Sequence, residues 1–355
     1  MLLPTYRKRV EKRVAMNAVK RNCSIDIFRY VCAVLVVIIH TEPFYRGEYA
    51  AIGIFLKDYV ARIAVPFFLT VSGYYYFHRI DSKGAVWKYV WRLVKTYAIW
   101  SLPYFLINFW ALKDEAGAIV KFFLKCVLDF FFFGSPFHFW FFPALIYSIL
   151  IVTFLYKKIG FKALSIISAL LFIVGCLGSS YLKIGLEIPI LADLFQFEYF
   201  AAVRRIFLTG IPFVCLGGWL SVNKAKFENT TNKKLGTALV ITVLLYAAEK
   251  TAVTLLSWQD NLVNTIVLIP LVAIIVLLLL KNPAPEKEAI SRKAKNCANF
   301  MYYMHVACIL FLKQTLGSFF EGTFYGLILF VLVVIIMTIT GMLFSRIKIA
   351  NKLLG

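Results

Sequence analysis

Charged side chains are scarce in this sequence: Asp, Glu, Lys and Arg make up 16% of its 355 residues. Acidic residues are the rarer kind, 18 against 39 Lys and Arg, which gives a net charge of +21. A soluble protein this basic is usually a nucleic-acid binder whose charge lies on a polar surface. Here 61% of the residues are hydrophobic and the mean hydropathy is +0.79, so too little polar surface exists to cover a water-soluble globule. The composition therefore excludes a soluble nucleic-acid binder, and no nucleic-acid partner is expected.

Motifs for metals, disulfides and bound phosphates are also missing. The seven cysteines are scattered and form no CxxC pair, which argues against a disulfide framework or a zinc site. There is no HExxH, no Gly-rich phosphate loop and no GxSxG elbow. The four histidines are far apart in the sequence: His40, His78, His138 and His305. We therefore expect no metal and no permanently bound cofactor.

Long hydrophobic runs, in contrast, are abundant. A membrane-spanning helix needs about 20 mostly apolar residues. The sequence predicts an all-α fold, a polytopic membrane bundle of about ten transmembrane helices within residues 25–345. A basic segment precedes this domain at 1–24, and a short tail follows it at 346–355. The predicted spans are 25–42, 59–78, 92–111, 138–157, 162–180, 202–222, 235–256, 262–281, 299–318 and 324–345.

The cations predict the orientation of these spans. If the N-terminus is cytoplasmic, alternate connections hold 27 of the 39 Lys and Arg, while most acidic residues fall on the other side. Cytoplasmic loops of membrane proteins carry such an excess of cations. We therefore expect both termini to be cytoplasmic, in a multi-pass protein of the plasma membrane with membrane lipid as its partner.

Two ionisable residues in the first span share one helix face. Arg29 and His40 are eleven residues apart, which at ~100° per residue returns to within ~20° of the same direction and separates them by ~16 Å along the axis. Ionisable groups at membrane depth are costly and usually functional. The alternative is that Arg29 extends to the inner headgroups and His40 caps the helix at the outer interface.

The second span and the segment after it add further polar candidates. Arg62 enters near the outer end, and Ser72 lies near the inner end beside Gly73, where close packing by small residues is the alternative role. Arg92 and Lys95 then lie at helical spacing with Lys88 on the cytoplasmic side. They could form a phosphate clamp for a nucleotide-bearing donor such as coenzyme A, but the charges alone favour an ordinary basic loop on anionic lipid.

Later spans contribute four more candidates. His138 and Trp140 lie at the outer boundary, where an aromatic belt is expected and Trp140 would act as an anchor. Arg205 opens the sixth span from outside. His305 lies six residues into the ninth predicted span, which places it in the inner half, away from His40 in the outer half.

These segments resemble one membrane-protein family along most of the chain. The similarity is carried by IDIFRYVCAVLVVIIH, RIAVPFFLTVSGYYYF, RLVKTYAIWSLPYF, HFWFFPALIYSIL, GIPFVCLGGWL and MYYMHVACIL, in that order. The sequence resembles the acyltransferase family 3 membrane proteins, which move acyl groups from cytoplasmic acyl-CoA to extracytoplasmic sugars. The resemblance implies His40 as the catalytic histidine and Arg29 as its essential partner. Where that family often has Arg-x-x-Arg, this chain has Arg92-x-x-Lys95, which keeps the charge but loses one bidentate fork.

The resemblance and the buried polar residues together favour an O-acyltransferase. Acyl-CoA, with an acetyl group expected, would be the donor substrate, and a hydroxyl of an extracytoplasmic glycan of the cell envelope the acceptor. The expected substrate-binding and acyl-CoA-binding residues are Arg62, Ser72, Arg92, Lys95, His138, Trp140, Arg205 and His305.

Two alternatives stay open. The sequence is also similar to the membrane domain of vancomycin-resistance serine racemases, without a counterpart of their cytoplasmic racemase domain, and that similarity implies a permease for a small polar solute such as serine or for an acylated glycan. A structural or regulatory subunit, whose buried charges only set helix packing, is the third hypothesis.

Overall fold

In the computed structural model every regular element of the described residues is helical. The structure describes residues 21–347, apart from 46, 112–122, 135–136, 260, 317–321 and 323, together with 353–354. Five described stretches are long and apolar enough to cross a membrane, and a sixth is added if the pair α14 and α15, bent by 89°, counts as one. An all-α membrane fold is therefore confirmed. The number of ten spans and the cytoplasmic termini stay predictions, and most of 1–24 and 346–355 lies outside the described residues.

Nine longer helices form the bundle in the described part of the chain. They are α2 (Cys23–Thr41), α4 (Ala64–Phe77), α5 (Ala85–Ala111), α7 (Phe141–Leu177), α11 (Ile211–Val222), α13 (Asn232–Leu255), α14 (Leu268–Lys281), α15 (Glu288–Leu316) and α16 (Tyr325–Phe344). Shorter helices connect them: α3 (Ala50–Ile54), α8 (Leu182–Leu186), α9 (Pro189–Gln196), α10 (Phe200–Val203) and α12 (Lys224–Phe227). π-helical turns lie at Phe55–Val60, Asp129–Phe133 and Arg204–Gly210, and 3-10 turns at Gly47–Tyr49, Ala61–Ile63, Phe137–Trp140 and Pro285–Lys287.

Local sequence explains where several of these helices begin and break. The Asn22 side chain caps α2 by accepting a hydrogen bond of 2.9 Å from the backbone N–H of Ile25. The helix α15 follows Pro285 and has Glu288 in its first turn, as helix starts commonly do. Gly160 interrupts α7 with a φ of 77°, within the predicted connection between the fourth and fifth spans.

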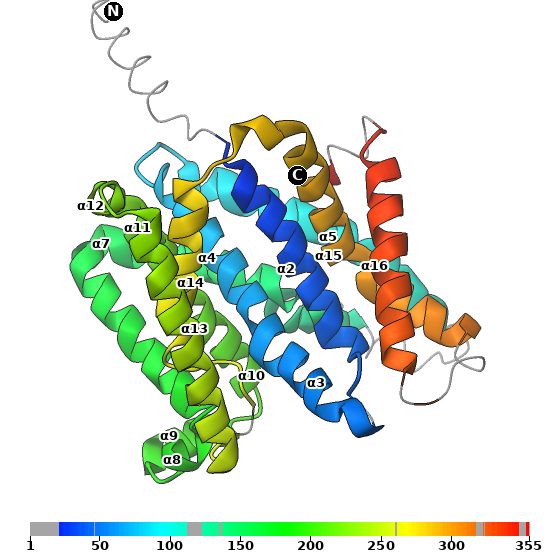
Figure 1. Cartoon of the computed structure of the whole chain (residues 1–355), viewed down its shortest axis with the longest axis horizontal. Coiled ribbons are helices and arrows are strands. Elements are labelled where there is room, and N and C mark those ends of the chain that lie inside the picture. The colour runs from blue at the N-terminus through cyan, green and yellow to red at the C-terminus, as the bar shows by residue number, and fades with distance from the viewer. Residues whose placement is uncertain are drawn as a thin grey trace, which may run out of the picture.

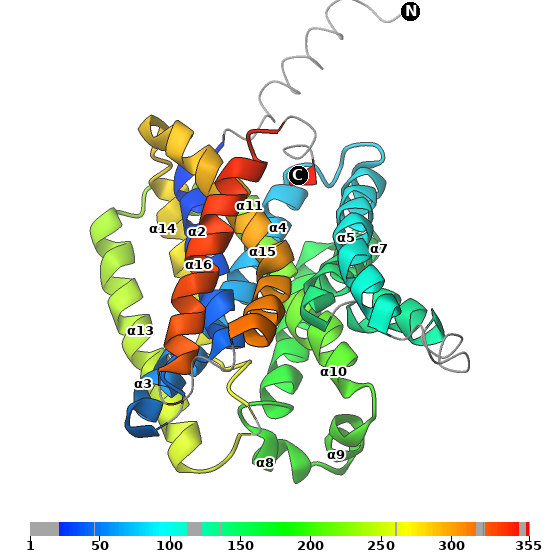
Figure 2. The same cartoon turned by 90° about the vertical axis from the view of Figure 1, so that its right-hand side faces the viewer.

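The helices α2 and α4 lie at the centre of the bundle. Figure 1 shows α13, α11 and α14 to one side of them and α15 and α16 to the other. Seen at right angles, α13 lies at one edge and α5 with α7 at the opposite edge (Figure 2). Large apolar side chains from these helices form two buried clusters, one around α4, α11 and α14 and the other, rich in aromatic rings, around α5, α15 and α16. Both clusters include residues of α2, which joins the two halves.

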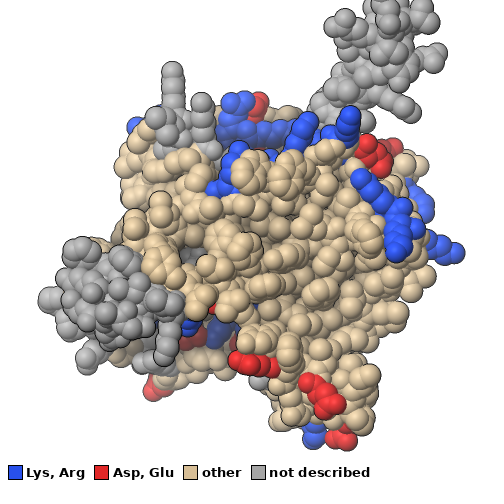
Figure 3. Space-filling view, turned by 180° about the vertical axis from the view of Figure 1, so that it is seen from behind, with Lys and Arg blue, Asp and Glu red and all other residues tan. Residues whose placement is uncertain are grey.

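Charge is divided between the two ends of the bundle. Figure 3 shows Lys and Arg gathered along one end of the face opposite to that of Figure 1, and several Asp and Glu at the other end. The broad middle of this face is almost free of charged side chains (Figure 3). A charge-free middle between a basic end and an acidic end is the pattern expected of a bundle that crosses a bilayer.

Candidate active site

A cavity of about 940 Å³ extends along the centre of the bundle. It is lined by Asn22 and Arg29 near the first turns of α2 and by His40 at its other end, so it follows this helix for most of its length. The opposite walls come from α4, α5 and α15, and the π-helical turn Arg204–Gly210 lines the end near His40. One cavity thus connects the two ends of the membrane domain; below, the end near Arg29 is called the inner end and the end near His40 the outer end.

Most residues singled out in the sequence line this cavity. They are Arg29, His40, Arg62, Ser72, Arg92, His138, Trp140 and Arg205. Lys95 is exposed on α5 and is not part of the lining, whereas Lys88 and Arg92 are. His305 is fully buried behind the lining. The structure therefore brings together residues that are spread over almost the whole sequence.

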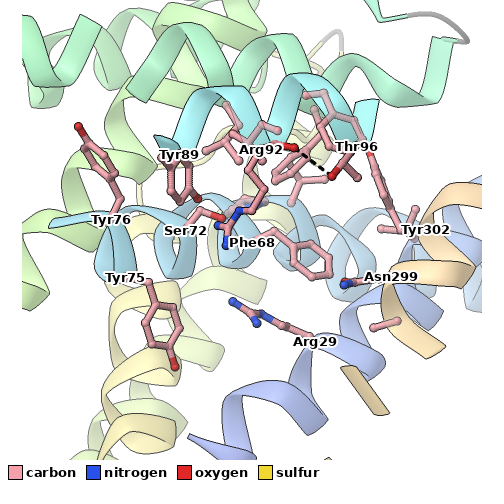
Figure 4. A pocket seen from close by; sticks show the side chains of 18 of the residues that line it. Arg29, Phe68, Ser72, Tyr75, Tyr76, Tyr89, Arg92, Thr96, Asn299 and Tyr302 are labelled. Carbon is pink, nitrogen blue, oxygen red and sulfur yellow. Dashed lines mark hydrogen bonds between the residues drawn. The ribbon is translucent and has the colours of Figure 1, made fainter. Parts of the chain in front are cut away.

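The inner end is strongly basic. Figure 4 shows Arg29 of α2 and Arg92 of α5 reaching into the cavity from opposite walls. Among the described lining residues Asp26 is the one acid, and its carboxylate is shared by Arg21 at 2.8 Å and Arg29 at 3.1 Å. The cations of this end are Arg21, Arg29, Arg79, Lys83, Lys88, Arg92 and Lys295. Such an excess of cations over acids suits a ligand that carries several phosphates.

Aromatic rings hold the two inner arginines. The Arg29 guanidinium lies 5.7 Å from the centre of the Tyr75 ring, and the Arg92 guanidinium lies 5.2 Å from that of Tyr89. Cation–π contacts of this kind fix a guanidinium without neutralising it. Arg92 therefore keeps its charge for a ligand in the cavity, whereas Arg29 also shares the Asp26 carboxylate with Arg21.

Of the two neighbours Ser72 and Gly73, one lines the cavity and the other allows close helix packing. Ser72 lines the cavity beside Tyr89 (Figure 4). Gly73 faces the neighbouring helix, where a Cβ atom would collide with the backbone of Val214 in α11. Close packing therefore explains Gly73, and Ser72 belongs to the site.

Three histidines meet at the outer end. The rings of His40 and His305 have centroids 5.1 Å apart, and so do those of His138 and His305. The expected placement of His40 and His305 at different depths is wrong, because α15 begins at Glu288 and not near Asn299. His138 is only 3% exposed and lines this end of the cavity, and its position at the outer membrane boundary stays a prediction. No group of three or more His, Cys, Asp or Glu in the described part of the chain is arranged to hold a metal ion.

The hydrogen bonds of His305 define its tautomer. Its Nδ1 donates to the carbonyl oxygens of Met301 at 2.9 Å and Tyr302 at 3.0 Å. The ring is therefore protonated at Nδ1, and Nε2 carries the lone pair. Nε2 is buried and has no hydrogen-bond partner within the described residues. A proton acceptor thus lies buried next to His40.

Trp140 and Arg205 form the wall facing this cluster. The Arg205 guanidinium lies 5.1 Å from the centre of the Trp140 ring, and both side chains line the cavity. Trp140 therefore contributes to the site and is more than the aromatic anchor expected from its position in the sequence.

Sequence inspection missed the wall that α15 contributes. Lys295, Asn299 and Tyr302 line the cavity at spacings of four and three residues. Residues at such spacings share one face of a helix, so the pattern itself was visible. Hydropathy does not reveal this wall, because Lys295 precedes the apolar run of the ninth predicted span.

The sequence that forms this cavity matches a known protein family. A family described as an acyltransferase domain matches residues 22–346, nearly the whole chain. The chain belongs to the acyltransferase family 3. The match includes every residue that lines the cavity except Arg21 and Leu354, so nearly all of the cavity lies within this acyltransferase domain.

Proteins similar to this chain include longer proteins that are named as racemases. An amino-acid racemase of Enterococcus faecalis is 27% identical over 342 residues, which cover 91% of this chain and 46% of that protein. A second amino-acid racemase of Enterococcus faecalis is 30% identical over 208 residues, or 58% of this chain and 29% of that protein. A serine/alanine racemase of Enterococcus gallinarum is 28% identical over 215 residues, 56% of this chain and 29% of that protein. The chain thus spans less than half the length of these relatives, and no solved structure matches it.

Proposed function

We propose that the chain is a membrane O-acyltransferase that moves an acyl group, expected to be acetyl, from cytoplasmic acyl-CoA to a hydroxyl of an extracytoplasmic cell-envelope glycan. The observation that carries this proposal is the continuous cavity with a basic inner end and His40 at its outer end. A donor bound by its phosphates and an acceptor arriving from the other side meet within one cavity of this shape. Membership of the acyltransferase family supports the reaction type.

The inner end provides what the donor requires. The phosphates and nucleotide of coenzyme A would bind to Arg92, Lys88 and neighbouring cations, with Arg29 further along the cavity. The narrow arm that carries the thioester would then extend toward His40, ~16 Å from Arg29 along α2. Lys95 is not needed for this arrangement, since it lies outside the cavity lining.

His40 is the residue to which we assign the chemistry. As a general base, its imidazole takes the proton of the acceptor hydroxyl while the hydroxyl oxygen bonds to the thioester carbonyl carbon. The carbon–sulfur bond breaks, and the coenzyme A thiolate leaves and takes up the proton from the imidazolium. As an alternative, the imidazole carries the acyl group briefly before passing it to the acceptor. A nearby guanidinium stabilises the negative charge that develops on the carbonyl oxygen.

A permease for a small polar solute such as serine is the second candidate. Two observations favour it: the cavity runs between both ends of the domain, and the relatives are named as amino-acid racemases, one of them a serine/alanine racemase. A solute path would use the same buried arginines and histidines as binding groups.

One experiment separates these functions. Purified protein in liposomes is given labelled acetyl-CoA on one side and glycan on the other, and labelled serine uptake is measured in parallel. The acyltransferase proposal expects transfer of label to the glycan, or slow hydrolysis of acetyl-CoA when the glycan is absent. Serine uptake without any turnover of acetyl-CoA would replace it with the permease.

The role of His40 has its own test. We expect His40→Ala to lower acyl transfer roughly 10²- to 10⁴-fold, the range typical for loss of a general acid–base group. The measurement is the rate of label transfer by protein whose folding is checked by gel filtration. His78, which lies outside the cavity lining, offers a matched control in His78→Ala. Full transfer by folded His40→Ala protein would contradict the mechanism.

A further inference from the structure

The outer end of the cavity is basic as well as the inner end. Arg62, Arg204 and Arg205 line it, and the described lining residues of this end include no Asp or Glu. The donor accounts for the cations of the inner end but not for these three. We propose that the outer end binds an oxyanion, a carboxylate or phosphate group carried by the acceptor, with the Arg205 guanidinium as its main partner. The identity of the bound molecule as an acceptor rests on the proposed acyl transfer.

Arg205 differs from Arg29 and Arg62, two other arginines of the cavity, in its partners. The Arg29 guanidinium is paired with Asp26 at 3.1 Å and that of Arg62 with Asp58 at 2.8 Å. Arg205 forms no ion pair with any described residue and donates one hydrogen bond of 3.3 Å, from its Nη1 to the carbonyl oxygen of Phe133. A guanidinium has five N–H donors, so most of its binding capacity is unused.

Three acidic residues on this side of the bundle are bound to other groups. Glu42 pairs with Lys57 at 2.5 Å, and Asp58 pairs with Arg62. Glu249 accepts hydrogen bonds from Tyr181 at 2.6 Å and from the backbone N–H groups of Ile266 and Val267 at 2.5 and 2.9 Å. None of these three carboxylates forms an ion pair with Arg205.

A cation without a counter-ion is expensive at membrane depth. Ionisable groups there pair with one another or mark the path of a charged substrate. The face of the Trp140 ring holds the Arg205 guanidinium in place without neutralising it, the guanidinium centre lying 5.1 Å from the ring centroid. A planar guanidinium held in this way suits the two oxygens of a carboxylate or phosphate, which it binds through parallel hydrogen bonds.

The position of Arg205 defines which part of the reaction it serves. It lines the same end of the cavity as His40 and His138, whereas the phosphate-binding cations of the proposed donor site lie at the other end. An anionic group bound at Arg205 would hold a neighbouring hydroxyl of the same molecule near the His40 imidazole. The outer end would then select anionic acceptors over neutral ones.

Matched probes test the proposal by binding alone. Affinities of D-glucuronate and of its neutral amide, glucuronamide, are measured by calorimetry on the full chain in nanodiscs at low ionic strength with excess coenzyme A. Glucose 6-phosphate and glucose form the second pair. We expect the wild type to bind at least one anion roughly tenfold or more tightly than its neutral counterpart, as befits a charged hydrogen bond. The pair with the larger preference distinguishes a carboxylate acceptor from a phosphate acceptor.

Variants locate the anion. Arg205→Gln is expected to abolish the preference and Arg205→Lys to keep part of it, while Arg92→Gln at the inner end keeps it in full. If the wild type shows no preference, or if folded Arg205→Gln keeps it, the proposal is overturned. A preference lost in Arg92→Gln and kept in Arg205→Gln would place the anion at the inner end and overturn it too.

Kinetics then separate acceptor binding from stabilisation of the developing charge. In acyl transfer, Arg205→Gln is expected to raise KM for the anionic probe and leave kcat and the neutral probe unaffected. A fall in kcat for both probes would assign Arg205 to the reacting carbonyl and overturn the proposal. Anion binding without acyl transfer would instead keep the outer anion site and remove the proposed function.

Discussion

The contacts of His305 indicate how the His40 ring is held in position. It is fully buried, its Nδ1–H is committed to the carbonyl oxygens of Met301 and Tyr302, and its ring lies against those of His40 and His138. A neutral ring fixed in one tautomer cannot easily become a second cation beside an imidazolium. We therefore assign His305 the role of positioning His40, without contact to substrate.

Replacing His305 tests this assignment. We expect His305→Phe, which preserves a planar ring but removes the hydrogen bonds, to lower kcat for acyl transfer by about tenfold to 10²-fold, because a misplaced catalytic group is costly. The KM for acetyl-CoA should be unchanged, since the donor site lies at the other end of the cavity. Steady-state kinetics give both constants. Equal losses in kcat and in the amount of folded protein would instead indicate a purely structural residue.

Spacing along one helix made part of the site predictable. Arg29 and His40 were placed on one face by the geometry of a single helix, and both line the cavity. The depth of His305 was not predictable from hydropathy, because an apolar run marks the bilayer core and not the helix start. The signal for the true start was Pro285 followed by Glu288, a proline and an acid at a helix N-terminus.

At the level of elements, the contact between α4 and α11 fixes one wall of the cavity. Gly73 of α4 faces the Val214 backbone, and Gly217 of α11 faces the carbonyl oxygen of Thr70. The two helices approach closely because glycine lacks a side chain at both points. Ser72, next to Gly73, is held at the cavity surface by this approach.

Gly73→Ala should therefore destabilise the protein. The added methyl group would collide with backbone and force the helices apart, at a cost of about 1–3 kcal/mol. We expect a lower Tm for the purified protein by circular dichroism. Gly236→Ala in α13 is the matched control, because a Cβ atom there meets nothing within 4 Å. A Tm for Gly73→Ala as high as that of the control would contradict the close contact.

The helix α13 is attached to the bundle by a lysine that the sequence did not single out. Lys250 is fully buried, and its Nζ donates to the carbonyl oxygens of Asp58 and of Leu262, the latter at 2.9 Å. Its ammonium also lies 4.7 Å from the centre of the Tyr246 ring. Hydropathy could not show this, since one lysine hardly alters the average of an apolar run.

Lys250→Met should loosen this attachment. The substitution keeps the length of the side chain but leaves two buried carbonyl oxygens without their donor, at a cost of about 1–3 kcal/mol for each unsatisfied group. A fall in Tm is expected, again measured by circular dichroism. Lys234→Met, at an exposed position of the same helix, serves as control and should leave Tm unchanged. Equal Tm values for the two variants would show that Lys250 does not hold α13.

For the whole molecule, the distribution of charge predicts which end of the bundle faces the cytoplasm. The inner end of the cavity, the start of α2 and the turn between α4 and α5 share an excess of Lys and Arg. Each cation near an anionic leaflet contributes about 1 kcal/mol of attraction. Because these contributions add up at one end, they favour the orientation with the basic end in the cytoplasm, the side from which acyl-CoA would enter in the proposed reaction.

Cysteine labelling tests this orientation in cells. In a variant without the seven native cysteines, Asp81→Cys lies between α4 and α5 and Glu187→Cys lies between α8 and α9, both at exposed positions. A membrane-impermeable maleimide should label Glu187→Cys in intact cells and Asp81→Cys only after permeabilisation, because the basic end faces the cytoplasm. The reverse pattern would place the basic end outside. Cytoplasmic acyl-CoA would then have no access to Arg92, and the direction proposed for acyl transfer would be wrong even if the chemistry at His40 were right.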